Sequence, residues 1–269
     1  MSVLLQISDT HFGTEQPVVV EALVALALQQ QPDIVVLSGD ITQRARPAQF
    51  RQAREFVDRL KAPVVAIPGN HDIPLMDIAA RLFRPYARYA LAFGNTLEPV
   101  FICSDMLVVC VNTTRAYRHK NGEVSQTQID RVAQLLQAAN TSQLRVVVVH
   151  QPIAVMHAHD TVNLLRNHAA AQKQWAAAGA DLVMGGHIHL PYTLALSGLA
   201  RPMWAVQAGT GVSKRVRAGA PNSVNVVRWG STLAAGLCQI EQWDFNVASH
   251  AFACVKVTQV VPARAGYGA

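Results

Sequence analysis

VLLQISDTH, residues 3–11, is a short apolar run that ends in polar residues. The same arrangement returns in IVVLSGD (residues 34–40) and VVAIPGNHD (residues 64–72). Between these runs, Val18–Gln30 and Ala48–Leu60 have helical patterns. Alternating strand and helix patterns of this kind predict an α/β fold with largely parallel central strands.

The middle of the chain repeats the alternation. We expect a hairpin formed by Val100–Cys103 and Leu107–Val111. It is followed by expected helices and strands at Ser125–Ala139 (helix), Val146–Val149 (strand), Asn167–Ala178 (helix) and Leu182–Met184 (strand). Segments Ile73–Asn95 and Val155–His168 are less regular, and we expect them to form the walls or lid of a site at the carboxyl ends of the strands.

The last third of the sequence predicts successive antiparallel strands, at Tyr192–Leu196, Met203–Val206, Val224–Trp229, Leu237–Phe245 and Ala251–Val257. No internal repeat, linker or composition shift divides the chain, so we expect one domain over residues 1–269. Its core spans about 1–212, strands at about 223–258 complete the second sheet, and 261–269 form a tail. The exposed edge of these last strands is also a candidate contact between two subunits.

Composition excludes several classes of protein. Hydrophobic residues make up 51% and charged residues 15% of the 269 residues, so the chain is not intrinsically disordered. The apolar run Val18–Leu28 is interrupted by Glu21 and is too short to span a membrane, and the N-terminus has no signal-peptide pattern. We therefore expect a cytoplasmic protein.

Its four cysteines form no CxxC motif and are expected to be buried, reduced thiols. The net charge of +6 is compatible with an anionic substrate, nucleic acid included.

Polar clusters interrupt the apolar pattern at the carboxyl ends of the predicted strands. They are Asp9-Thr10-His11, Gly39-Asp40, Gly69-Asn70-His71-Asp72, His150 and Gly186-His187-Ile188-His189. Parallel strands bring such ends to one edge of a sheet, so the clusters are expected to converge. Oxygen and imidazole ligands without thiolate suit manganese, iron or zinc. Seven such ligands exceed the needs of one tetrahedral ion and fit two ions that share a carboxylate.

Glycines precede most of these clusters. Gly39, Gly69, Gly185 and Gly186 are expected where the chain turns sharply off a strand. Because glycine can adopt the conformations that such turns require, the ligand residues would lie directly after the turn.

Together, in this order, the five clusters resemble the signature of the calcineurin-like binuclear metallophosphoesterases, over Val3 to about Val212. The resemblance implies a four-layer α/β/β/α sandwich with two mixed sheets flanked by helices. It also implies two metal sites that share Asp40. Their ligands would be Asp9, His11, Asp40 and His189 for one ion, and Asp40, Asn70, His150 and His187 for the other.

The resemblance further implies the chemistry. Two ions about 3.5–4 Å apart clamp the oxygens of an in-line displacement, and a bridging hydroxide attacks phosphorus. His71 would face the scissile phosphate, as a charge stabiliser or as an acid toward the leaving oxygen, and Asp72 would orient it.

Gly39–Arg44 and Asn112–Gln128 are similar to the class III cyclic-nucleotide and glycerophosphodiester phosphodiesterases, which favours small phosphodiesters as substrates. A nuclease of the same superfamily is the alternative. A UDP-sugar pyrophosphatase ranks lower because that branch usually has arginine at the position of His71. A non-catalytic interaction module ranks lower still because every expected ligand is present.

Other polar residues near these motifs are candidates for substrate binding, namely Arg44, Asn112, His157 and His159. A structural turn at Asn112, and solvent exposure of the other three, are the alternatives. His119, His168 and His250 have no partner pattern and are expected to be ordinary histidines.

Overall fold

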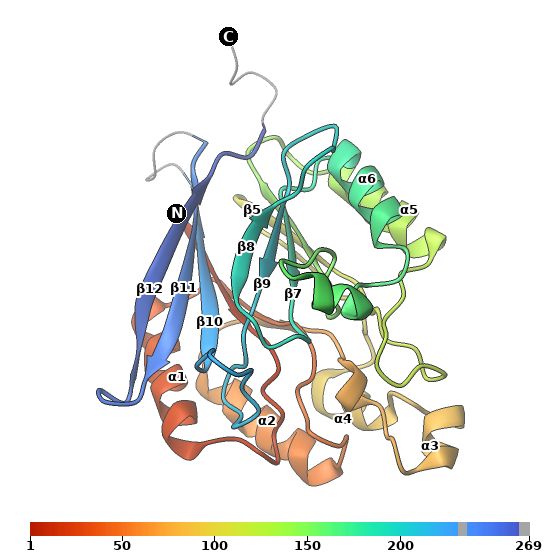
Figure 1. Ribbon diagram of the computed structural model, residues 1–269, viewed down its shortest axis with the longest axis vertical. Helices are drawn as coiled ribbons and strands as arrows, with labels where there is room; N and C mark the ends of the chain where they lie inside the picture. The colour runs from red at the N-terminus through yellow and green to blue at the C-terminus, as the bar shows by residue number, and fades with distance from the viewer. Residues whose placement is uncertain (231–235, 264–269) are drawn as a thin grey trace.

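The computed structural model describes residues 1–230 and 236–263, and within them two six-stranded sheets pack face to face (Figure 1). Residues 264–269 of the expected tail lie outside the described residues. The facing sides of the sheets form one apolar core, to which Leu4 and Val36 contribute from one sheet and Val146 and Met184 from the other. Burial of this shared surface holds the two sheets together.

The first sheet contains the N-terminal strands and the C-terminal strands. Its order is β12-β11-β10-β1-β2-β3, with bounds β12 (Ala251–Val260), β11 (Cys238–Asn246), β10 (Ser223–Trp229), β1 (Ser2–Ile7), β2 (Ile34–Leu37) and β3 (Val64–Ala66). β1 is buried throughout, so both of its edges need hydrogen-bonding partners. Parallel β2 supplies one partner and antiparallel β10 the other.

The second sheet is built from the middle of the chain. Its order is β4-β5-β6-β7-β9-β8, with bounds β4 (Val100–Ile102), β5 (Met106–Cys110), β6 (Leu144–Val148), β7 (Leu182–Gly185), β9 (Trp204–Gln207) and β8 (Tyr192–Ala195). β5, β6, β7 and β9 are parallel to one another, whereas the outer strands β4 and β8 are antiparallel to β5 and β9. The expected β4–β5 hairpin is confirmed.

Two predictions about the last third of the chain are corrected. β10, β11 and β12 extend the sheet that contains β1, whereas we expected the strands at about 223–258 to complete the second sheet. β9 is antiparallel to β8, as expected, but its other neighbour is β7, to which it is parallel, so the pairing in this region is not antiparallel throughout. The chain leaves β7, reverses along β8, and returns between them, which gives β9 the direction of β7.

Helices cover the outer face of each sheet. α1 (Pro17–Gln30) and α2 (Pro47–Arg59) pack on the first sheet, and α5 (Gln126–Gln137) and α6 (His168–Ala178) on the second (Figure 1). These layers confirm the α/β/β/α sandwich. Among the helices of residues 1–230 and 236–263, none is long and apolar enough to cross a membrane.

Local sequence explains where the main helices begin. Pro17 and Pro47 occupy the first turns of α1 and α2, where the missing N–H of proline costs nothing. Ser125 caps α5: its hydroxyl accepts a hydrogen bond from the Gln128 backbone N–H, and the Gln128 side chain accepts one from the Ser125 N–H at 3.0 Å.

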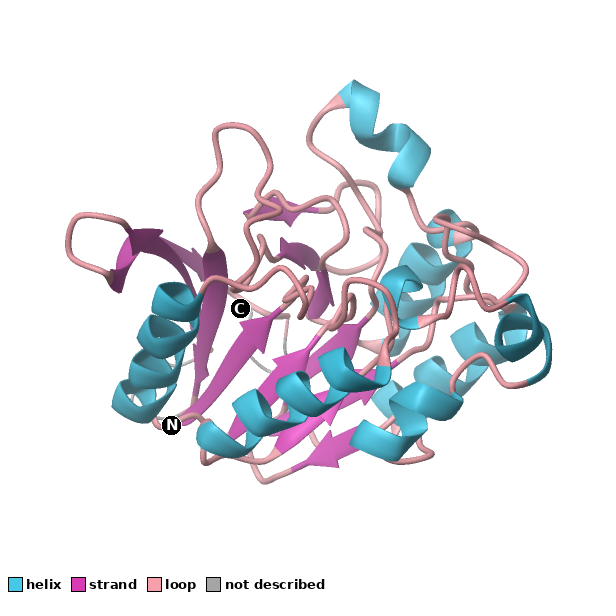
Figure 2. Cartoon of the chain, turned by 90° about the horizontal axis from the view of Figure 1, so that it is seen from below, coloured by secondary structure: helices cyan, strands magenta, loops and turns pink. Residues whose placement is uncertain are grey.

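The two segments expected to be irregular contain short helices. Residues 73–95 include α3 (Ile78–Phe83) and α4 (Ala87–Phe93), and residues 155–168 include the 3₁₀ helix Ala158–Asn163, called η2. Figure 2 shows long loops gathered beyond the arrowheads of the central strands, the region where the polar clusters lie.

Candidate metal centre

The polar clusters converge, as the parallel strands predict. Asp9 and His11 follow β1, Asp40 follows β2, and Asn70 begins the 3₁₀ helix η1 (Asn70–Asp72) after β3. From the second sheet, His150 follows β6, and the pair His187 and His189 follows β7. The centre therefore lies across the junction of the two sheets, with ligands from both.

Several of these side chains are placed by left-handed backbone. φ is +52° at Asp9, +50° at Asp40 and +73° at His187, and His11 and His189 are also in this region. Such a conformation costs a non-glycine residue about 1–2 kcal/mol. Backbone hydrogen bonds hold it in place, including Asp9 N–H to Gly39 C=O at 3.0 Å and His11 N–H to Asp40 C=O at 3.0 Å.

The glycines next to the ligands are required for space more than for turning. A Cβ atom on Gly69 would lie 2.0 Å from the Asp40 backbone nitrogen. A Cβ atom on Gly186 would lie 1.9 Å from Ser8 Oγ and 2.4 Å from Asp9 Oδ2. Only at Gly39 is φ left-handed, at +97°, as the expected sharp turn requires.

One group of ligand atoms is formed by Asp9, His11 and His189, which lie within 4.8 Å of one another. Nε2 of His189 lies 3.3 Å from Asp9 Oδ1 and 3.3 Å from His11 Nε2.

A second group is formed by Asp40, His150 and His187. Nε2 of His150 lies 3.3 Å from Asp40 Oδ1, and Asp40 Oδ2 lies 3.8 Å from His11 Nε2. Asp40 thus faces both groups.

Four buried atoms of these residues make no hydrogen bond among the described residues: Asp9 Oδ1, Asn70 Oδ1, His150 Nε2 and His187 Nε2. The only close polar neighbours recorded for Asp9 Oδ1 and His150 Nε2 are other candidate ligands of the described residues. Buried polar atoms are normally satisfied, so this concentration of exceptions needs an explanation. Each is an oxygen or imidazole nitrogen that ligates first-row transition metals. The residues present therefore fit a binuclear metal centre.

Electrostatics divide the imidazoles into two kinds. Burial lowers the pKa of His11 to about 3 and that of His187 to about 3, which keeps both rings neutral. Burial also opposes the charge of Asp40, but the adjacent His150 outweighs it and holds the pKa of Asp40 well below its usual range. For His150, burial lowers the pKa, but Asp40 outweighs burial and raises it to about 9.

Further hydrogen bonds orient the ligand rings. Nδ1 of His150 lies 2.8 Å from the Ser38 carbonyl, and Nδ1 of His189 contacts the Arg215 carbonyl. The carboxylate of Asp9 accepts from Ser8 Oγ at 2.7 Å and from the His187 N–H at 2.9 Å. Donation from Nδ1 leaves Nε2 free to bind a metal.

The structure places His71 beside the centre but corrects the role expected for Asp72. Nδ1 of His71 lies 2.9 Å from the Gln43 carbonyl, which is therefore the group that orients the ring. The Asp72 carboxylate instead accepts from the backbone N–H groups of Ile41, Thr42 and Gly69 at 2.7–3.0 Å and from Thr42 Oγ1 at 2.8 Å. Burial, followed by the charge of Asp40, raises the pKa of Asp72 to about 6. Asp72 thus fixes the loops that carry Asp40 and His71.

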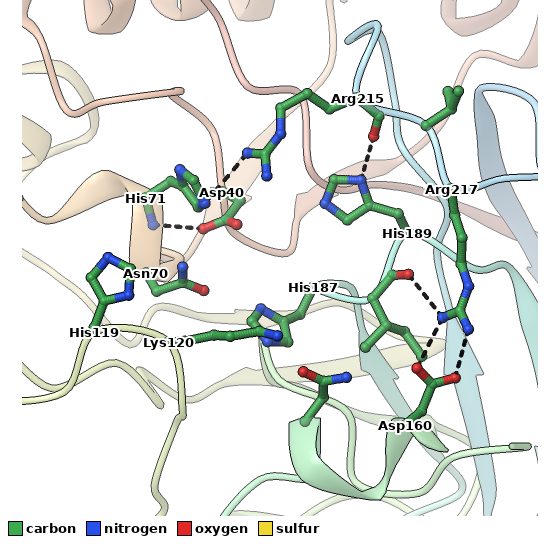
Figure 3. A pocket seen from close by; sticks show the side chains of 13 residues that line it. Asp40, Asn70, His71, His119, Lys120, Asp160, His187, His189, Arg215 and Arg217 are labelled. Atoms are coloured by element: carbon green, nitrogen blue, oxygen red, sulfur yellow. Dashed lines mark hydrogen bonds and ion pairs between the residues drawn. The ribbon is translucent and has the colours of Figure 1, made fainter. Parts of the chain in front are cut away.

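A cavity of about 560 Å³ opens onto the centre (Figure 3). Asp40, Asn70, His71, His187 and His189 line it. Its further lining residues include Asp160, from the segment 155–168 that we expected to form a wall of the site. They also include His119, Lys120, Arg215 and Arg217, which we did not expect there.

These residues were missed because they lie in loops without a metal-ligand pattern. The signal that could have found two of them is Lys214-Arg215-Val216-Arg217, a basic stretch in the loop after β9. His119, expected to be an ordinary histidine, lies in an exposed stretch that reaches the cavity.

The other residues predicted to contact substrate lie at different places. Arg44 lines a smaller neighbouring cavity that also contains His71 and Arg215. Asn112 is buried, and its Oδ1 accepts from the Thr114 N–H at 3.0 Å and Thr114 Oγ1 at 2.7 Å, a turn contact. His157 and His159 are exposed, with stacked rings whose centroids lie 5.4 Å apart, outside the residues that line either cavity.

The chain is similar in sequence to curated phosphodiesterases. A probable cyclic nucleotide phosphodiesterase of Synechococcus is 26% identical over 60% of this chain and 59% of its own length. A cAMP/cGMP dual specificity phosphodiesterase of Mycobacterium tuberculosis is 28% identical over 70% of this chain and 61% of its own. The matched part of the chain thus spans about three-fifths of each relative.

The fold also matches solved structures. A dimetal phosphatase from Danio rerio superimposes with a TM-score of 0.68 over 97% of this chain and 99% of its own, at 12% identity. The family model described as calcineurin-like phosphoesterase matches residues 2–191, the part of the chain that carries every ligand residue. With most of its length matched, the chain belongs to the calcineurin-like phosphoesterase family.

Proposed function

We propose that the protein is a metal-dependent phosphodiesterase that hydrolyses small phosphodiesters, with cyclic nucleotides or glycerophosphodiester-like compounds as the substrate class. The observation that carries this proposal is the pair of ligand groups on the two sides of Asp40, with His71 at their edge and a cavity in front. The names of the Synechococcus and Mycobacterium relatives support the same class of reaction.

The centre would hold two ions of manganese, iron or zinc, because its donors are carboxylate, amide and imidazole. Asp9, His11 and His189 would hold one ion, Asn70, His150 and His187 the other, and Asp40 would bridge them. Bound ions would neutralise charge on the phosphoryl oxygens and promote deprotonation of water.

The chain itself supplies orientation and proton transfer. His71 donates its Nδ1 proton to the Gln43 carbonyl, so Nε2 faces the cavity as the atom that contacts the scissile phosphate or its leaving oxygen. The cavity has room for a small ligand and lies within the range typical of small-molecule sites.

A substrate panel with manganese-reconstituted protein tests the proposal. It contains bis-p-nitrophenyl phosphate, p-nitrophenyl phosphate, 2′,3′- and 3′,5′-cyclic nucleotides, glycerophosphodiesters and single-stranded DNA. We expect turnover of the diesters or cyclic nucleotides, and a loss of at least about 100-fold in Asp40→Ala, because the shared ligand is gone. Asp58→Ala, which removes an exposed carboxylate from α2, is the matched control.

Three other results of the substrate panel would contradict the proposed function. DNA cleavage without turnover of small diesters would favour a nuclease. No turnover by protein that holds two ions would contradict the proposed substrate class. Failure to bind metal at all would favour a non-catalytic interaction module.

A further inference from the structure

The loop between β9 and β10 places Arg215 over the metal centre. Its backbone is fixed on both sides: the Arg215 N–H donates to Ser213 Oγ at 3.0 Å, and the Lys214 N–H donates to the Thr14 carbonyl at 3.0 Å. The Arg215 carbonyl accepts from Thr210 Oγ1 at 2.9 Å and contacts His189 Nδ1. The side chain therefore projects from an ordered loop.

The guanidinium of Arg215 points into the centre, toward His71 (Figure 3). Its Nη1 lies 3.0 Å from Gln43 Oε1, 3.3 Å from His71 Nε2 and 3.3 Å from His11 Nδ1. A guanidinium has five N–H donors and no acceptor, so these contacts, all made by Nη1, use only part of its capacity.

The charge of Arg215 is uncompensated. Among the described residues, no carboxylate lies within ion-pair distance of it. Its neighbour Arg217, which lines the same cavity, is fully paired: its two terminal nitrogens each lie 3.0 Å from an oxygen of buried Asp160. A half-buried, unpaired cation that faces a cavity is suited to binding an anion.

We propose that Arg215 is a phosphate-binding residue, which donates to a non-bridging oxygen of the scissile phosphodiester from the side of His71. This inference rests on the proposed function and adds a residue to it. Arg215 supplies fixed positive charge at the wall of the cavity beside His71, where the phosphoryl group gains charge in the transition state.

The test is the affinity of inorganic phosphate, measured by titration calorimetry on protein loaded with two manganese ions per chain and freed of excess metal. We expect Arg215→Ala to weaken phosphate binding about 10- to 100-fold, the effect of losing hydrogen bonds to a charged group. Arg215→Lys is expected to recover part of the affinity, and added guanidinium to restore part of the turnover of Arg215→Ala. Metal content stays at two ions, since the backbone carbonyl that supports His189 is retained.

Lys214→Ala is the matched control, because it removes one positive charge from the same loop at an exposed position. We expect its phosphate affinity to stay within about twofold of wild type. Equally weakened phosphate binding in Arg215→Ala and Lys214→Ala would show that only the total positive charge of the loop matters, and it would overturn the proposal. Lower turnover of Arg215→Ala with unchanged phosphate affinity would also overturn it, and make Arg215 a positioning residue for His71.

Loss of metal from Arg215→Ala would overturn it as well, because the side chain would then act through the ligands. Phosphate binding is measured without turnover, so this test remains decisive if the substrate panel disproves the proposed function.

Discussion

Ligand residues in left-handed backbone are the feature of this centre that a sequence motif does not reveal. Asp9, His11, Asp40, His187 and His189 all have positive φ, each in the loop that follows a strand. Strain of this kind persists only where surrounding structure enforces it, and it is concentrated at functional sites. Here the enforcing contacts are backbone hydrogen bonds between neighbouring loops, so the ligand geometry is set by the fold.

Gly69→Ala is predicted to damage the centre without touching a ligand. The added Cβ would meet the Asp40 backbone nitrogen at 2.0 Å, and backbone cannot move aside as a flexible side chain can. We expect a loss of about 3 kcal/mol or more in the free energy of unfolding, together with fewer bound metal ions. Urea denaturation and elemental analysis measure the two effects.

Gly219→Ala is the control for this substitution. Gly219 has φ of +81° and no atom within 4 Å of the added Cβ, so only the backbone penalty of about 1–2 kcal/mol applies. Metal content should be unchanged. Equal metal loss in both variants would show that general destabilisation, and not the contact with Asp40, empties the site.

Asp72→Asn is predicted to act on the loops more than on His71. The asparagine amide can accept from some of the N–H groups of Ile41, Thr42 and Gly69 but also turns a donor toward them, which we expect to cost about 2–3 kcal/mol of stability. The midpoints of the pH–rate profile should stay in place, because the Gln43 carbonyl orients His71. A shifted midpoint at unchanged stability would restore the role first expected for Asp72.

The residues that were predictable are those whose chemistry and position agree. A histidine or aspartate that ends an apolar run predicts both a candidate metal ligand and its place. The structure gathers six of the seven candidates into two groups and places the seventh, Asn70, at the same cavity. Arg215 carries no such pattern. Its importance depends on the path of a loop across the sheet edge, which hydrogen bonds distant in sequence determine.

At the scale of elements, local pattern predicted the strands and helices but not their partners. β10 satisfies one edge of β1 although more than 200 residues separate their ends in the chain, and nothing in either strand's alternation specifies that pairing. The parallel direction of β9 was missed for the same reason. Short α3 was missed because it buries none of its residues and so shows no amphipathic pattern.

Glu241→Gln is predicted to weaken the β10–β11 pair in a pH-dependent way. The buried Glu241 carboxylate accepts from Arg228 Nε at 2.8 Å and from Trp243 Nε1 at 2.8 Å. Burial opposes its charge, but Arg228 together with the hydrogen bonds from Trp243 and Gln239 outweighs burial and lowers the pKa of Glu241. A lowered folded-state pKa contributes stability above the unfolded value, near 4.5, and this contribution is lost as pH falls below it.

We therefore expect Glu241→Gln to cost about 1–3 kcal/mol at pH 7 and markedly less near pH 3.5, measured by urea denaturation at both pH values. Asp58→Asn, in the exposed pair with Arg54, should leave the stability nearly unchanged at either pH, because solvent screens an exposed ion pair. A cost for Glu241→Gln that is the same at pH 7 and pH 3.5 would show that its charge does not stabilise the sheet.

At the scale of the whole molecule, the centre joins two units that are otherwise held by apolar contact. Asp9, His11, Asp40 and Asn70 come from the first sheet, and His150, His187 and His189 from the second. Each sheet also packs its own outer helices, so neither half depends on the centre for its core. Metal binding is thus expected to stabilise a structure that already exists, by linking the carboxyl edges of its two sheets.

Removal of metal is therefore predicted to leave the protein folded but less stable. At a free metal concentration 1,000 times the dissociation constant, bound metal adds about 4 kcal/mol of stability per site. The gain depends on pH, because a metal binds only neutral imidazole and the pKa of His150 is raised to about 9 without metal. Below that pH the metal must displace a proton, so affinity falls as pH falls.

Thermal unfolding with chelator and with manganese, at pH 6 and pH 8, tests both parts. We expect a cooperative transition for the chelated protein, a higher Tm with manganese, and a larger difference at pH 8 than at pH 6. Without metal, protonated His150 forms an ion pair with Asp40 that partly replaces the missing ion. Because His150 is protonated at pH 6, this pair stabilises the chelated protein there, and manganese adds less stability. A manganese-induced shift in Tm that is equal at both pH values would mean that His150 is neutral before metal binds. If the chelated protein is unfolded, then the centre, and not the apolar contact between the sheets, holds the two halves together.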